Sequence, residues 1–339
     1  MTTEKQVLEK LDGVLVPGVA RSAVKMNLVR EIKVTDHKVD IALSSAAINE
    51  DAREWLKKEI DEAVKQLAGV KETSITFHDG KPQDINQVAN RIAIMSGKGG
   101  VGKSLVTAML GASLVRQGKE VGILDGDITG PSIPKILGVS KSRPVGDTTG
   151  LLPVPTRSGI EVMSINLVLE FEDDAVIWRG PLIGKALQQF WQDVLWGKLD
   201  YLLIDLPPGT SDAPLTVMQS MSLTGVIVVF SPQELATMVV KKAVKMANNM
   251  NIPILGLVEN MSYFEVPGTK EKLELFGKSK IKDMAEQTGV PLKVQIPVDP
   301  EIARLCDGGR IESYKSEEFD KFTRKLIQQL TPKSGEKQK

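Results

Sequence analysis

One short stretch, residues Gly97 to Ser104, constrains this chain more than any other feature. It reads Gly-Lys-Gly-Gly-Val-Gly-Lys-Ser and satisfies the pattern G-x-x-x-x-G-K-[ST]. An apolar stretch, Arg91–Met95, precedes it and a helical pattern starts at Lys103, as the pattern requires. Glycines let successive backbone N–H groups converge on phosphate oxygens, and the helix dipole favours the same anion. The sequence therefore predicts a loop that binds the phosphates of a nucleotide.

The residue types in the loop indicate ATP as the nucleotide. Lys103 is expected to reach the β- and γ-phosphates, and the Ser104 hydroxyl to bind Mg²⁺. A chance glycine-rich turn is the alternative, but it does not explain the flanking strand and helix. A dinucleotide site is excluded because Lys103-Ser104 completes a triphosphate motif. The residues expected to contact ATP in this loop are Gly97, Lys98, Gly99, Gly100, Val101, Gly102, Lys103 and Ser104.

Polar residues follow three other apolar stretches. Val121–Leu124 leads to Asp125 and Asp127, Tyr201–Ile204 leads to Asp205, and Ile254–Glu259 leads to Asn260. The carboxyl ends of parallel strands share one edge of a sheet, where ligands bind. We expect Asp125 and Asp205 to hold Mg²⁺ with Ser104, and Asp127 to lie near the attacking water. The alternatives are turn or capping residues for the carboxylates and for Asn260.

The order of patterns predicts two domains. Residues 1–80 read as a small α+β domain, 81–90 as a linker after Asp79-Gly80, 91–331 as an α/β domain, and 332–339 as a disordered tail. In the larger domain, apolar strands alternate with helices, which predicts a mostly parallel sheet covered on both faces. Its expected strands are Ile92–Met95, Val121–Leu124, Gly159–Ile165, Tyr201–Ile204, Gly225–Phe230, Ile254–Glu259 and Leu292–Ile296.

Composition limits the partners. Among 339 residues, 43 are Lys or Arg and 43 are Asp or Glu, so the formal net charge is zero. This balance gives no bulk attraction to nucleic acid or to an anionic membrane. The chain lacks an apolar run of about 18 residues, and its charged, amphipathic start differs from a secretory signal. We therefore expect a cytoplasmic protein with no membrane partner.

Four stretches together resemble the Mrp/ApbC family of ATPases, which are associated with carrying iron–sulfur clusters. They are Asp125–Ser132, Trp178–Pro181, Asp205–Asp212 and Glu259–Phe264. The loop with its second lysine, Lys98, is similar to the deviant P-loop of the class that includes the nitrogenase iron protein, MinD and ParA. The likeness covers most of residues 90 to 330, and the N-terminal region more weakly resembles the small domain that often precedes the ATPase.

The resemblance implies a homodimer with ATP at or near the interface. It implies that Lys98 contacts phosphate across that interface, that Asp127 orients the attacking water, and that Asn260 contacts adenine. It also places Trp178 and Arg179 on the shared surface, for which a packed Trp and a surface Arg are the alternative. Lys98 as a solvated loop charge is the alternative to its phosphate contact.

One departure from the family concerns the cluster. Cluster-carrying members have a Cys-x-x-Cys pair just after the Met-Ser-Tyr-Phe stretch, whereas this chain continues Glu265-Val-Pro-Gly-Thr-Lys270. The small domain has Ser44–Asn49 where its family often has a cysteine. The single cysteine, Cys306, is expected to be a buried apolar residue. A dimer would offer two thiolates, and clusters held by cysteine generally need four.

The predicted activity is Mg²⁺-dependent ATP hydrolysis that switches a dimer, with Lys98, Lys103 and Asp127 as catalytic residues. The resemblance further implies transfer of iron–sulfur clusters to apoproteins. The alternative is a cluster-free, ATP-gated adaptor or regulator that binds a protein or DNA partner.

Overall fold

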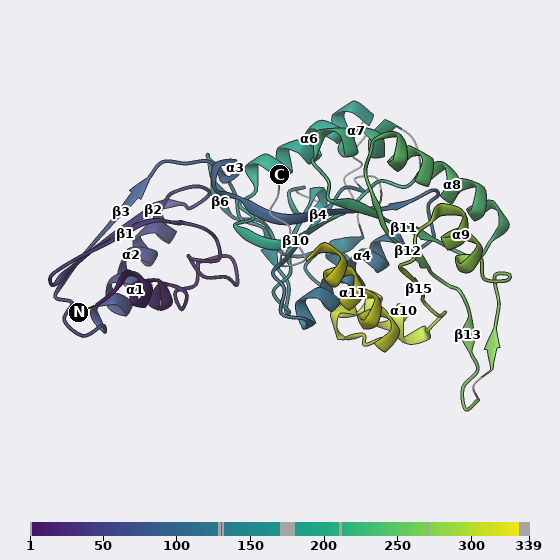
Figure 1. Ribbon diagram of the computed structural model, residues 1–339. Helices are drawn as coiled ribbons and strands as arrows, with labels where there is room; N and C mark the ends of the chain where they lie inside the picture. Colours follow the sequence, from purple (N-terminus) through teal and green to yellow (C-terminus); the bar gives the residue numbers. More distant parts are fainter. Residues whose placement is uncertain are drawn as a thin grey trace.

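The computed structural model describes residues 2–127, 130, 132–169, 180–209, 212–269 and 271–331. The chain forms a small N-terminal domain beside a larger α/β domain (Figure 1). Trp178, Arg179 and the tail from Pro332 lie outside the described residues, so their predicted roles stay predictions. In the described ranges, none of the helices has the length and apolar character that a membrane span needs.

The small domain is a three-stranded sheet packed against two helices. Its strands are β1 (Val29–Thr35), β2 (Lys38–Ser44) and β3 (Glu72–His78); β1 and β2 are antiparallel, and β2 and β3 are parallel. The helices are α1 (Glu4–Leu11) and α2 (Glu50–Lys65). Leu56, Ile60 and Val64 recur at helical spacing on α2 and are fully buried, so α2 packs by one apolar face.

The larger domain contains an eight-stranded sheet in the order β15-β12-β11-β4-β10-β5-β9-β8. Its neighbouring strands are parallel except β8 and β9. This confirms the predicted fold class. The strands are β4 (Gln87–Ser96), β5 (Val121–Asp125), β8 (Val154–Pro155), β9 (Glu161–Ser164), β10 (Lys198–Asp205), β11 (Gly225–Phe230), β12 (Ile254–Glu259) and β15 (Lys293–Gln295).

Helices cover both faces of this sheet. One face packs against α6 (Gly180–Asp193), α7 (Asp212–Ser220), α8 (Glu234–Asn249) and α9 (Ile281–Thr288). The opposite face packs against α4 (Lys103–Arg116), α5 (Ile133–Ile136), α10 (Pro300–Asp307) and α11 (Glu317–Leu330) (Figure 1). Strands buried on two faces must be apolar throughout, which explains runs such as Gly225–Phe230.

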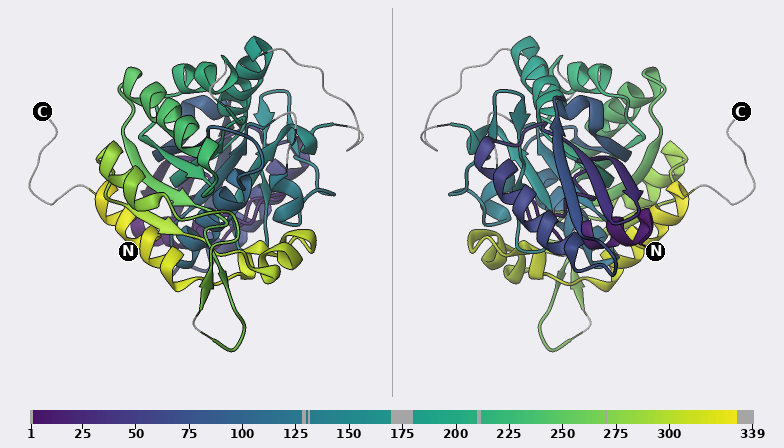
Figure 2. Two further views of the ribbon diagram at one scale, coloured as in Figure 1. Left: turned by 90° about the vertical axis from the view of Figure 1, so that its right-hand side faces the viewer. Right: turned by 90° about the vertical axis from the view of Figure 1, so that its left-hand side faces the viewer.

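The shorter elements lie outside these layers. Two antiparallel ribbons pair β6 (Gly146–Asp147) with β7 (Gly150–Leu151) and β13 (Phe264–Glu265) with β14 (Lys272–Leu273). The second ribbon projects from the body of the protein (Figure 2). Short 3₁₀ helices occupy Ile165–Leu167 and Ile311–Ser313.

Residues 81–90, predicted as a linker, are regular structure. Pro82–Ile85 forms the short helix α3, and β4 starts at Gln87, where it pairs with Lys198 of β10. The side chain of Asn86 donates to Val194 C=O at 2.9 Å and accepts from the backbone N–H groups of Trp196 and Gly197. Hydrogen bonds with distant backbone therefore order a stretch whose low apolar content had indicated a loop.

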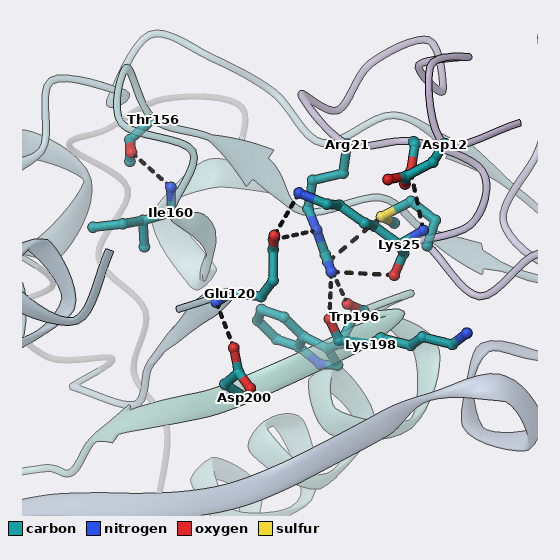
Figure 3. A network of polar contacts seen from close by, with 11 residues as sticks. Asp12, Arg21, Lys25, Glu120, Thr156, Ile160, Trp196, Lys198 and Asp200 are labelled. Carbon is teal, nitrogen blue, oxygen red and sulfur yellow. Dashed lines mark hydrogen bonds and ion pairs between the residues drawn. The ribbon is translucent and has the colours of Figure 1, made fainter. Parts of the chain in front are cut away.

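A buried arginine joins the two domains. Arg21 is 3% exposed; its guanidinium donates to Trp196 C=O at 2.8 Å and to Lys198 C=O, and forms an ion pair with Glu120 at 3.1 Å (Figure 3). Lys25 forms the second ion pair of Glu120, at 2.6 Å. The core of the small domain also includes Leu152 and Leu195 of the larger domain. The two domains therefore share a packed, hydrogen-bonded seam.

Candidate nucleotide-binding site

The loop that connects β4 to α4 has the backbone that the glycines predict. Gly100 and Gly102 have φ of +77° and +82°, in the left-handed region that favours glycine. A Cβ atom on Gly102 would collide with the side chain of Asn260. Gly102 is thus required both by its backbone conformation and by this close approach.

A cavity of about 300 Å³ opens above this loop. It lies at the carboxyl ends of the parallel strands, which is where open α/β sheets bind ligands. The lining residues are Ser96, Gly99, Gly100, Val101, Gly102, Lys103, Ser104, Leu105, Asp127, Gly130, Ser132, Ile136 and Pro208. The loop, α4 and the segment after β5 therefore surround one space.

Asp205 is the centre of the polar contacts below this cavity. β10 lies between β4 and β5, which places the Asp205 carboxylate under the first turn of α4. It contacts Lys103 Nζ at 2.8 Å and accepts hydrogen bonds from Ser104 Oγ at 2.6 Å and Thr107 Oγ1 at 2.7 Å. Thr107 is an additional residue of the site that the loop motif does not include, although its position three residues after Ser104 places it on the same helix face.

The ammonium group of Lys103 keeps capacity for a further partner. Its side chain is 5% exposed, and it is an ion-pair partner of Asp205 at 2.8 Å and of Asp127 at 3.9 Å. Among the described residues, Nζ has no contact with hydrogen-bond geometry. A buried, charged donor of this kind fits a ligand that brings anionic oxygens.

Asp125 and Asp127 have different environments. Asp125 aligns with Asp205 on the neighbouring strand and is 1% exposed; burial, followed by the charge of Asp205, raises the pKa of its carboxyl well above the usual range. It accepts from Asp127 N–H at 3.2 Å and from Ser164 Oγ at 3.1 Å, and it does not line the cavity. Asp127 does line it. Of the two carboxylates, Asp127 is therefore the one that faces a ligand.

Lys98 and Asn260 also lie apart from the cavity lining. The Lys98 ammonium donates to the side chain of Gln233, just before α8. Asn260 is 3% exposed, and its amide donates to Val101 C=O at 2.9 Å, so it supports the loop from below. Its predicted contact with adenine stays a prediction.

The segment after Asn260 is organised by a buried carboxylate. Glu259 accepts hydrogen bonds from Ser262 Oγ at 2.5 Å, Ser279 Oγ at 2.6 Å and Gln295 Nε2 at 3.1 Å. These contacts hold both ends of the segment that carries the β13–β14 ribbon. Cys306 lies elsewhere, on α10, where it is half-buried and burial raises the pKa of its thiol. Its side chain packs against the core of the larger domain, but it is only partly buried, where a buried residue was expected.

Comparisons with known proteins agree with this geometry. The family of NUBPL iron-transfer P-loop NTPases matches residues 87–331, and the family described as iron-sulfur cluster assembly protein matches residues 4–77. An iron-sulfur cluster carrier protein of Methanocaldococcus jannaschii is 43% identical over 74% of this chain and 88% of its own length. One of Helicobacter pylori is 31% identical over 98% of this chain and 93% of its own length.

Solved structures give the same result. A nucleotide-binding protein of Archaeoglobus fulgidus, in complex with ADP, has 47% identity and a TM-score of 0.63, over 69% of this chain and 92% of that one. The MinD cell division protein of Aquifex aeolicus, at 20% identity and a TM-score of 0.51, covers 72% of this chain and 99% of that one and shows the shared fold. The chain therefore belongs to the family of NUBPL iron-transfer P-loop NTPases, of the Mrp/ApbC type, with an N-terminal iron–sulfur assembly domain.

Proposed function

We propose that this chain is a Mg²⁺-dependent ATPase that works as a nucleotide-controlled dimeric switch. The observation that carries the proposal is the group formed by Lys103, Ser104 and Asp205, which lies below a phosphate-sized cavity with Asp127 on its wall. Phosphoryl transfer needs positioning, charge neutralisation and an oriented nucleophile. These residues supply a cation, a metal-binding hydroxyl and a carboxylate near the water.

The donor atoms fit magnesium. Ser104 Oγ and the Asp205 carboxylate are oxygen donors 2.6 Å apart, and Mg²⁺ prefers oxygen ligands. Among the described residues, no cluster of three or more His, Cys, Asp or Glu could hold a metal alone. This supports a metal held jointly by Ser104, Asp205 through water, and the nucleotide phosphates. When bound, Mg²⁺ supplies positive charge that offsets charge on the phosphates.

The chain's own residues have distinct roles in this proposal. Lys103 moves from its ion pair with Asp205 toward the β- and γ-phosphates, since Nζ keeps donors for them. Asp127 accepts a hydrogen bond from the attacking water and orients it. Asp125 positions Asp127, whose backbone N–H it binds, because it is buried behind the cavity wall.

Lys98 supports the dimeric part of the proposal. The residue belongs to the loop but does not line the loop's own cavity, and its ammonium is held by Gln233 at the protein surface. A loop lysine held away from its own site is suited to a phosphate bound by a second copy. Family resemblance implies the same arrangement.

We further propose that the switch serves iron–sulfur apoproteins, because the relatives are named iron-sulfur cluster carrier proteins and a carried cluster needs a recipient. The residues here do not fit a cluster held by a cysteine pair, since the chain has one cysteine and it lies on α10. Any cluster that it handles is therefore bound by groups other than four thiolates of two copies. The proposed protein therefore serves iron–sulfur apoproteins, as the family role implies, and acts on them as an ATP-gated adaptor.

Light scattering and ATP turnover with Mg²⁺ test the switch, with Lys98→Ala compared with the exposed-residue control Lys141→Ala. We expect the wild type and the control to dimerise with ATP and to hydrolyse it. We expect Lys98→Ala to bind ATP, remain monomeric, and lose about 10²-fold in turnover. An Lys98→Ala variant that dimerises and turns over like the wild type would contradict the shared site.

Anaerobic reconstitution with iron and sulfide tests the cargo. We expect the folded, ATP-bound protein to retain less than one cluster per dimer after desalting, with no change in Cys306→Ser. A stoichiometric cluster that Cys306→Ser abolishes would contradict our assignment of the thiol to the core.

A further inference from the structure

The second cavity that bears on function lies at an edge of the large sheet. β15 (Lys293–Gln295) is the last strand in the order and, within the described part of the chain, pairs with β12 alone. Toward β12, Leu292 C=O accepts from Leu257 N–H and Ile296 N–H donates to Glu259 C=O, both at 2.9 Å. Successive residues of a strand direct their backbone groups to opposite sides. Lys293 and Gln295 therefore present their N–H and C=O groups outward, where they meet no backbone partner among the described residues.

A groove of about 350 Å³ runs along this edge. α9 packs on one face of β15 and α11 on the other, so the edge lies between the two helices (Figure 1). The lining residues are Tyr263, Lys272, Ile281, Lys282, Leu292, Lys293, Val294, Gln295, Glu318, Lys321, Phe322 and Lys325. Ile281, Leu292, Val294 and Phe322 are buried and form an apolar floor.

The rim of the groove is strongly basic. Five of the lining residues are lysines and one is a glutamate, in a chain whose net charge is zero. Lys321 forms ion pairs with Glu317 and Glu318 at 3.1 Å. Within the described ranges, Lys282, Lys293 and Lys325 form no ion pair. The groove thus has uncompensated positive charge on both sides of an unpaired strand.

We propose that this groove binds an extended, acidic segment of a protein partner, which adds to the sheet as a strand beside β15. The outward backbone groups of Lys293 and Gln295 would pair with the segment's backbone, as in other cases of strand addition. Carboxylates on the segment would meet the lysines of α9 and α11, and apolar side chains would meet the floor. This recognition needs no nucleotide and so goes beyond the proposed function.

The groove favours an acidic peptide over nucleic acid. The lining contains no arginine, whose planar fork recognises phosphate, and the outward backbone groups of β15 pair with a peptide backbone. Tyr263 is its aromatic residue near the rim, and Lys272 Nζ lies 3.9 Å from the centre of that ring. This ring is therefore already covered on one face, whereas binding of single strands relies on bases stacked on free aromatic faces.

Binding of labelled probes to the full chain tests the proposal. The probes are a ten-residue peptide of alternating Glu and Val, its Lys and Val counterpart, and a single-stranded oligothymidine, each followed by fluorescence anisotropy. We expect the Glu peptide to bind with an affinity that falls with added salt, and the other two not to bind. We also expect slower amide hydrogen exchange at Lys293 and Gln295 when the Glu peptide is bound.

Two sets of variants separate charge from strand pairing. Lys282→Glu with Lys325→Glu reverses charge on both helices without touching β15, and Lys5→Glu with Lys141→Glu is the matched control. We expect the first pair to bind the Glu peptide about 10-fold more weakly than the wild type does. The control pair should bind it as the wild type does. Lys293→Pro and Lys293→Ala lose the same charge, but proline also loses the outward N–H. We expect proline to weaken binding about 2- to 10-fold beyond alanine.

Three outcomes would overturn the proposal. The Glu peptide could fail to bind at millimolar concentration. The lysines would then serve to prevent the open edge of β15 from pairing with the sheet edges of other chains. Oligothymidine could bind and be lost in the helix variant, which would assign the groove to nucleic acid. Amide exchange at Lys293 and Gln295 could stay unchanged on binding, which would exclude strand addition. The helix variants and exchange data keep the test valid if Lys293→Pro does not fold.

Discussion

Two clusters of buried charge lie at opposite ends of the same two strands. β5 and β10 end at Asp125 and Asp205, below the nucleotide cavity. At their other ends, Glu120 comes just before β5, and the first residue of β10, Lys198, accepts a hydrogen bond from Arg21 (Figure 3). One cluster therefore belongs to the ligand site and the other to the seam between the domains.

The clusters differ in what remains unsatisfied. Below the cavity, Asp205 has three partners, and the spare capacity is a cation, Lys103 Nζ. At the seam, Arg21 Nε also lacks a contact with hydrogen-bond geometry, although it forms the ion pair with Glu120 at 3.1 Å, and the further unsatisfied group is an anion. Glu161, on β9 beside Gly122 of β5, is fully buried, and neither carboxylate oxygen has a hydrogen-bond partner among the described residues. An unsatisfied cation that lines a cavity indicates a ligand, whereas an unsatisfied and fully buried carboxyl indicates a proton held by burial.

The largest expected effect comes from a substitution in the cluster below the nucleotide cavity. Lys103→Ala removes the buried cation and should reduce ATP turnover by about 10³-fold, because the phosphates lose their charged donor. Turnover and nucleotide binding are measured beside Lys141→Ala, with thermal melting as the check on folding. Activity at the wild-type level in Lys103→Ala would reject the assignment of this site.

The substitution Arg21→Met removes the hydrogen bonds and the ion pair that Arg21 forms at the seam between the domains. This change leaves the carbonyl groups of Trp196, Lys25 and Lys198 without their buried donor and should lower the free energy of unfolding by about 2–3 kcal/mol. Lys25→Met removes the exposed partner of the Glu120 carboxylate and should cost less than about 1 kcal/mol. Denaturant unfolding compares the two, and equal losses would show that the seam does not depend on the buried guanidinium.

A smaller effect separates binding from hydrolysis at the ligand end. Asp127→Ala should bind ATP with Mg²⁺ and hydrolyse it about 10²-fold more slowly, because the water loses its orienting carboxylate. Nucleotide affinity and single-turnover hydrolysis are measured together. Unchanged turnover would remove Asp127 from this role.

The last expected effect is a change in the pH dependence of stability, and it concerns Glu161. Burial is the main cause that raises the pKa of its carboxyl from 4.5 to about 8, while Arg21 opposes the shift. The folded state thus keeps a proton that the unfolded state releases, so stability is fully present below pH 4.5 and is lost as pH rises toward 8. The loss is at most about 1.4 kcal/mol for each pH unit.

Glu161→Gln removes this titration and should flatten the dependence of unfolding free energy on pH between 6 and 9, relative to the wild type. Denaturant unfolding at several pH values measures it, and Glu31→Gln, on the exposed strand β1, is the control. Parallel pH profiles of the wild type and Glu161→Gln would show that the carboxyl ionises freely in the folded protein.

Much of the larger domain could be predicted because its signals are local. Gly225–Phe230 and Ile254–Glu259 form β11 and β12 with the predicted bounds, since an apolar run between polar turns is read without knowing its neighbours. The loop from Gly97 to Ser104 was predicted for the same reason. The positive φ of Gly100 and Gly102 and the start of α4 follow from residue types within the loop, although the packing of Asn260 against Gly102 does not.

Contacts between distant residues could not be predicted in this way. Residues 81–90 lack apolar periodicity, and their order comes from hydrogen bonds between Asn86 and residues about a hundred positions away. Arg21 and Glu161 carry no sign in the sequence that they are buried. Asn260 was predicted at the site, but only packing shows that its amide is used by Val101.

The sequence by itself determined the phosphate-binding loop, the parallel α/β fold and the absence of a cysteine pair, because each follows from residue types at fixed spacing. The tertiary structure alone decided which carboxylate faces the cavity, where Lys98 is held, and that β15 leaves a basic edge open. Those properties depend on strand order and on which side chains burial brings together, and neither is a property of any local stretch of the chain.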